Sequence, residues 1–241
     1  MQIFAAREAV FKILAKESLS IHEKLIVILD MGSKIQQCIN TDEYDNIKSV
    51  VNDYLKEGIA HTLDETRNLS DSGQFEDISL QQGIRQILYP YEEMEVLNPE
   101  WEVILKDIID SLFEQMSDEE YNILNEEFGT YMVSRAYEYR QLLEYFVFRY
   151  FAKSIYDYDF LGKCQMLVTN FFVIRQMDII RWLDNHREYS FKDRMDVVHI
   201  FSRQVEYSED NIENLYEDFI FDDIFKTDSL IAILWIDNEN I

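Results

Sequence analysis

One predicted helix carries four ionisable side chains at intervals of three or four residues, which bring side chains onto one helical face. They are Asp196, His199, Arg203 and Glu206. Asp196 and His199 stand one turn apart, as in half of a di-iron helical bundle site, which needs a second such pair and two further carboxylates. None of the other histidines has an acidic residue three positions earlier. We therefore predict a surface ion pair here and no metal site.

Two arginines lie inside strongly apolar runs, Arg149 in FVFRYF and Arg175 in FFVIRQM. We expect part of each side chain to be buried, and a buried guanidinium requires carboxylate or carbonyl partners. The nearest suppliers are Glu144, Asp178 and Glu206. Two interpretations stay open for these arginines: an ion-pair network that joins helices, and an anchor for a carboxylate-bearing ligand. Together with His199, Arg203 and Glu206 they form one candidate pocket or ion-pair network.

An acidic run follows the first site, from Glu206 to Asp223. Most such runs are solvated surface, and acidic residues in early helical turns are favoured by the helix dipole. The alternative is a docking face for a lysine-bearing protein, formed by Glu209, Glu213 and Glu217.

Composition indicates the fold class. The chain of 241 residues has six Gly and two Pro, too few for the tight turns of a β-sandwich or barrel, and its 16 Phe and 15 Tyr supply a core. We predict an all-α fold, an irregular multi-helix bundle of about 8–10 helices. The net charge of −25 repels phosphate backbones and anionic lipids, so we expect neither a nucleic-acid nor a membrane partner.

Capping residues predict where the helices around these sites begin: Ser20, Asn98, Ser190 and Ser208. The pair Tyr89-Pro90 is expected to close a short helix that starts at Leu80. Residues 58–79 are polar and rich in turn formers. We therefore expect an amino-terminal helical subdomain over 1–57, a loop or boundary over 58–79, and a main helical domain over 80–241.

Cys38 and Cys164 lie far apart, each in an apolar helical pattern. We interpret them as reduced, buried residues of a cytoplasmic protein. The amino terminus lacks the pattern of a signal peptide, and the most apolar stretch, about 11 residues from Cys164, is too short to cross a bilayer.

Several strings of the chain resemble the carboxy-terminal region of the flagellin lysine-N-methylase family. These are the Tyr-rich segment YEYRQLLEYFVFRYFAKSIYDYD (Tyr137 to Asp159), the segment SRQVEYSEDN (Ser202 to Asn211), AREAVFKILAKESLSIHEKLIVILDMG (Ala6 to Gly32) and NPEWEVILKDIIDSL (Asn98 to Leu112). Together these strings cover most of the chain, and the resemblance rests on their order and spacing.

The resemblance implies a helical protein that supports methyl transfer from S-adenosylmethionine to lysine side chains of flagellin, its protein substrate. In that setting Arg149 and Arg175 become candidate anchors for the methionyl carboxylate. The family's cysteine cluster, which implies an iron–sulfur or other metal centre in a complete enzyme, is absent from this sequence.

The sequence shows no nucleotide-binding glycine loop and no recognisable catalytic set. The catalytic residues are therefore unknown, no cofactor is evident in this chain, and we expect it to have little methyltransferase activity alone. The competing hypothesis is a non-catalytic all-helical interaction domain with an acidic docking face.

Overall fold

The structure, a computed structural model, describes residues 2–71 and 78–239 and divides into two compact units. All regular elements of these residues are helical, which confirms the all-α prediction. Neither unit is one continuous piece of chain. The described residues of the first unit come from Met1–Asp77, Met132–Val168 and Lys226–Glu239, and those of the second from Ile78–Tyr131 and Thr169–Phe225.

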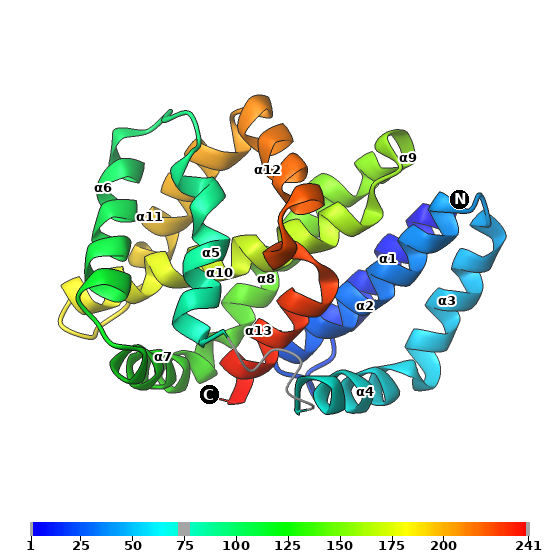
Figure 1. The fold of residues 1–241 in the computed structure, drawn as a ribbon, viewed down its shortest axis with the longest axis horizontal. Coiled ribbons are helices and arrows are strands. Elements are labelled where there is room, and N and C mark those ends of the chain that lie inside the picture. The colour runs from blue at the N-terminus through cyan, green and yellow to red at the C-terminus, as the bar shows by residue number, and fades with distance from the viewer. Residues whose placement is uncertain (1, 72–77, 240–241) are drawn as a thin grey trace. The chain divides into compact units, whose positions relative to one another are not determined.

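The first unit gathers helices from both ends of the sequence. They are α1 (Gln2–Leu14), α2 (Ile21–Asn40), α3 (Ile47–Asp53), α4 (Ile59–Asp71), α8 (Ala136–Tyr150), α9 (Ser154–Asp157), the beginning of α10 (Phe160–Asp184) and α13 (Thr227–Glu239). Helix α13, red in Figure 1, packs against α2 and α4. Ser20 caps α2 as predicted, because its hydroxyl accepts a hydrogen bond from the Glu23 N–H at 3.0 Å.

Buried polar contacts fix α13 in this unit. His22 Nε2 of α2 lies 2.6 Å from Asp237 Oδ2, and both residues are buried. The Trp235 indole N–H donates to Thr66 Oγ1 of α4 at 3.1 Å. Because buried polar groups are costly unless paired, these contacts specify one arrangement of the three helices.

The predicted loop at 58–79 contains a helix instead. Residues Ile59–Asp71 form α4, whereas 72–77 lie outside the described residues. The inward positions of α4 include Thr62 and Thr66, which are 2% and 8% exposed and make hydrogen bonds. Threonines therefore occupy buried positions where apolar residues, recurring with helical period, would have predicted the helix from the sequence.

The second unit contains the remaining helices. They are α5 (Leu80–Glu92), α6 (Pro99–Ile108) with the π-helical turn η3 (Ile109–Glu114), α7 (Asp118–Met132), the rest of α10, α11 (Phe191–Phe201) with the π-helical turn η6 (Ser202–Glu206), and α12 (Glu209–Phe221). Asn98, Ser190 and Ser208 cap α6, α11 and α12 as predicted. Trp101 and Phe201 meet edge to face in the core at 6.2 Å.

The expected helix end at Tyr89-Pro90 was wrong, because α5 continues through Pro90 to Glu92. Proline lacks an N–H and normally disrupts a helix interior. Here the following residue, Tyr91, is fully buried, and its hydroxyl hydrogen-bonds Asn170 Oδ1 at 2.8 Å. Tertiary contacts therefore hold this last helical turn in place.

The two units do not follow the division into 1–57, 58–79 and 80–241. Residues 226–239 belong with the amino-terminal helices, and α10 supplies residues up to Val168 to the first unit and from Thr169 to the second. No helix in the described part of the chain is long and apolar enough to span a membrane.

Candidate functional site

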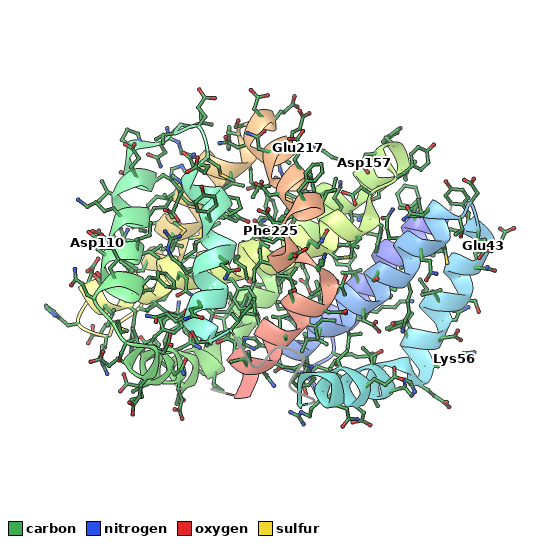
Figure 2. All side chains as sticks on the ribbon, in the orientation of Figure 1. Glu43, Lys56, Asp110, Asp157, Glu217 and Phe225 are labelled. Atoms are coloured by element: carbon green, nitrogen blue, oxygen red, sulfur yellow. The ribbon has the colours of Figure 1, made fainter. Side chains whose placement is uncertain are left out.

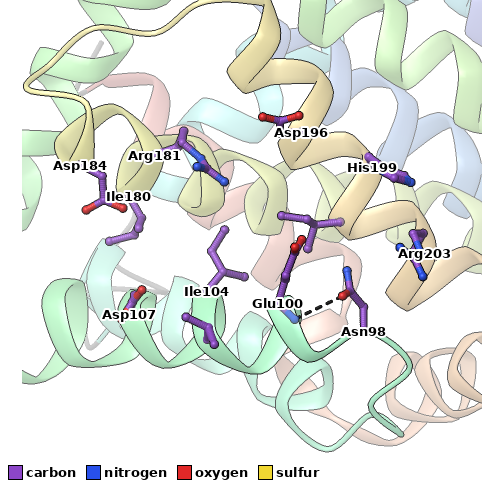
Figure 3. Close-up of a pocket in the computed structure, with 12 residues that line it drawn as sticks. Asn98, Glu100, Ile104, Asp107, Ile180, Arg181, Asp184, Asp196, His199 and Arg203 are labelled. Carbon is purple, nitrogen blue, oxygen red and sulfur yellow. Dashed lines mark hydrogen bonds between the residues drawn. The ribbon is translucent and has the colours of Figure 1, made fainter.

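A cleft of about 610 Å³ opens on the second unit between α6, the end of α10, and α11 with η6 (Figure 3). Four of its residues are aliphatic and most of the others are charged. The lining consists of Asn98, Glu100, Val103, Ile104, Asp107, Ile180, Arg181, Asp184, Asp196, His199, Ile200 and Arg203.

Helical spacing presents these side chains to the cleft. On α6, Glu100, Val103, Ile104 and Asp107 recur at three- and four-residue intervals, so they share one face. Asn98 fixes the start of this helix, because its side-chain carbonyl accepts a hydrogen bond from the Glu100 N–H at 3.2 Å.

The structure brings together three members of the predicted helical face. Asp196, His199 and Arg203 all line the cleft, and both His199 and Arg203 are exposed. Glu206 does not line it and is only 6% exposed. The cause is η6: a π-helical turn holds more residues than an α-helical turn, so the side chains after Phe201 are rotated relative to an uninterrupted α-helix.

The two arginines of the apolar runs have different environments. Arg175 lies in the second unit, 3% exposed, and donates hydrogen bonds to the side chain of Asn125 and, at 3.2 Å, to its backbone carbonyl. Arg149 lies in the first unit on an exposed surface, and its Nε donates to Tyr150 Oη at 3.1 Å. Neither arginine lines the cleft. The expected burial is found for Arg175 and not for Arg149, which is exposed.

A buried ion pair that we did not predict joins two walls of the cleft. Asp178 of α10 is fully buried and accepts hydrogen bonds from Arg194 Nη1 of α11 and from the Tyr189 hydroxyl. The sequence signal for this pair was Asp178 itself, an isolated carboxylate in an apolar run that needs a cation. Arg194 could not be assigned as that cation because the pairing depends on how α11 packs on α10.

Sequence reasoning also missed the cleft residues contributed by α6 and α10. Asp107 and Asp184 are exposed carboxylates, and Arg181 is partly exposed. Exposed charges on helices are ordinary surface residues, so nothing in their local pattern marks them as a group.

The charged groups of the cleft are only partly paired. Asp196 accepts a hydrogen bond from Lys192 at 2.7 Å, where the two side chains are 41% and 83% exposed. Among the described residues, the side chains of Arg203, Asp107 and Asp184 have no hydrogen-bond or ion-pair partner. Their charges therefore remain available to a ligand.

The described residues do not suit a metal cluster. No group of three or more His, Cys, Asp or Glu side chains in them is placed to hold a metal ion. Cys38 and Cys164 are both buried free thiols, and burial raises the pKa of Cys164 well above its ordinary value. Since thiolates are the metal-binding form, this thiol is a poor ligand.

The predicted docking residues Glu209, Glu213 and Glu217 are all exposed on α12, and Figure 2 marks Glu217 there. Burial, together with the charges of Asp222 and Glu217, raises the pKa of Asp218. The carboxylates of this segment therefore influence one another, as expected of a concentrated negative charge.

Comparison with known proteins identifies one matching family. The model described as FliB lysine N-methylase C-terminal domain matches residues 7–233. No curated protein and no solved structure matches the chain.

Proposed function

Because the chain belongs to the FliB lysine N-methylase C-terminal domain family, we propose that it takes part in protein-lysine methylation, with S-adenosylmethionine as methyl donor and flagellin as substrate. The observation that carries this proposal is the family match over residues 7–233. The match favours this function over that of a non-catalytic interaction domain.

We assign substrate recognition to the cleft of the second unit. A lysine side chain is an aliphatic stem with a cationic end. The cleft offers aliphatic residues for the stem, among them Val103 at 62% exposure, and unpaired carboxylates for the ammonium, Asp107 and Asp184.

The same carboxylates are unsuited to activating the amine. Nitrogen must be deprotonated to accept a methyl group, whereas a nearby carboxylate stabilises the protonated form of lysine. The cleft therefore serves to bind the substrate, and we assign no catalytic residue.

The activity is tested by producing this protein together with a cysteine-rich partner segment and flagellin in cells that lack lysine methylation, and by measuring flagellin lysines by mass spectrometry. We expect methyl increments on lysine and fewer of them for the pair D107N/D184N. Glu57→Gln, an exposed acidic residue of the first unit, serves as control. Unmethylated flagellin with every form of the protein would contradict the proposed function.

The expected low activity of the chain alone is tested with purified protein, labelled S-adenosylmethionine and flagellin. Label should appear on lysine only when a cysteine-rich partner segment is supplied. Robust transfer by the chain alone would refute this expectation. We place the reaction in the cytoplasm, where Cys38 and Cys164 would stay reduced.

A further inference from the structure

The charges of the cleft are ordered along its length. In Figure 3, Asp107 and Asp184 lie at one end, and His199 and Arg203 lie at the other. Helix termini reinforce this order. Asp184 is the last residue of α10, where the helix dipole is negative, and α6 begins near the Arg203 end, where its dipole is positive.

The centre of the cleft is close to neutral. Figure 3 places Arg181, Asp196 and Glu100 between the two ends. Lys192 is the ion-pair partner of Asp196. With it included, the two carboxylates of the centre are balanced by two cations, Arg181 and Lys192. The order of charge is therefore negative, neutral, positive, and a ligand that matches it carries a cation and an anion some distance apart.

The length of the cleft sets that distance. Glu100, in the centre of the cleft, and Asp107, at its negative end, are seven residues apart on α6, which at about 1.5 Å per residue corresponds to about 10 Å. Arg203 lies beyond Glu100 in Figure 3, so the two charged ends are more than about 10 Å apart. An extended peptide rises about 3.3 Å per residue, so it needs more than about three residues to reach from one end to the other. Between the ends, Ile104, Ile180 and Ile200 form an apolar floor on which such a segment can lie.

We propose that this cleft recognises an extended segment of the protein substrate in which a lysine stands more than about three residues from an acidic side chain. The lysine ammonium lies at Asp107 and Asp184. The acidic side chain lies at Arg203, whose planar guanidinium binds carboxylates through two parallel hydrogen bonds. This inference rests on the proposed function, because it names the sequence around the lysine that the cleft selects.

Peptide binding tests the inference without methyl transfer. Fluorescently labelled peptides carry Lys and Glu at spacings of three to seven residues, and matched peptides replace Lys by acetyl-lysine or Glu by Gln. We expect the unmodified peptide to bind best, with each replacement weakening binding about two- to fivefold, as for a partly exposed ion pair. Binding should weaken further with salt.

Variants of the protein assign each end. Arg203→Gln should abolish the preference for Glu over Gln and keep the preference for Lys over acetyl-lysine. The pair D107N/D184N should do the reverse, and Glu57→Gln should change neither. Circular dichroism melts confirm that each variant is folded.

The inference is overturned if Arg203→Gln weakens the Glu and Gln peptides equally, or if wild-type protein shows no preference between the peptides. Ordered preferences combined with unmethylated flagellin would support the cleft assignment and refute the methylation proposal. Methylated flagellin without these preferences would do the opposite.

Discussion

The buried ion pair of the second unit offers a direct test of how α11 is held on α10. Asp178 is fully buried and Arg194 is 5% exposed. Asp178→Asn preserves the shape of the side chain but leaves the guanidinium charge of Arg194 in the interior. Breaking one side of such a pair costs about 3–5 kcal/mol, a large part of the roughly 5–15 kcal/mol that stabilises a domain.

Urea denaturation measures this loss. With an m-value of about 3 kcal/mol/M, the midpoint should fall by about 1–1.7 M. Fluorescence reports the transition, because Trp101 and Trp182 both lie in the core of the second unit. Replacing both Asp178 and Arg194 by Leu should cost less than Asp178→Asn, since no charge remains buried.

The matched control is the exposed pair on α11. Asp196→Asn makes the same chemical change at Lys192–Asp196, where the two side chains are 83% and 41% exposed. Exposed pairs contribute about 0–1 kcal/mol, so its midpoint should hardly move. Equal shifts for Asp178→Asn and Asp196→Asn would refute the argument that burial makes the difference.

Three further predictions concern other parts of the molecule. Gly32→Ala should lower the melting temperature, because a Cβ would lie 2.6 Å from Cys164 Sγ. Such overpacking costs about 1–3 kcal/mol, which exceeds the gain of about 1 kcal/mol in helix propensity. An unchanged melting temperature would contradict this prediction. Burial raises the pKa of Tyr91 far above 10.0, so the folded state keeps a proton that the unfolded state loses. The free energy of unfolding should therefore decline from about pH 10 upward, and Tyr91→Phe should reduce that decline in urea titrations at about pH 9–11. Three exposed residues of α12 should be changed to Lys: Glu209, Glu213 and Glu217. Capture of a lysine-rich partner in a low-salt pull-down should then weaken, because the negative charge that attracts the partner is reversed. Unchanged capture would show that these residues are ordinary solvated surface.

Helix starts were predictable because their signals are local. Ser20 and Ser190 each reach the N–H three residues ahead, a contact that the sequence alone specifies. The helical state of Pro90 and the buried Thr66 were not predictable, since both depend on residues distant in sequence.

The candidate site was predictable only where one helix forms it. Asp196, His199 and Arg203 share a helix, so their spacing placed them together. Asp107 and Asp184 come from two other helices, and only tertiary packing brings them to one end of the cleft. Glu206 was assigned to the same face because a π-helical turn leaves no sequence signal that we recognised.

The late position of α13 has a consequence for biosynthesis. His22 and its partner Asp237 are 215 residues apart, and ribosomes add about 5–20 residues per second. A nascent chain therefore waits on the order of 10–40 seconds after making α2 before the helix that covers it exists. During that interval the apolar surface of α2 lacks the cover of α13, so molecular chaperones would meet this surface before α13 does.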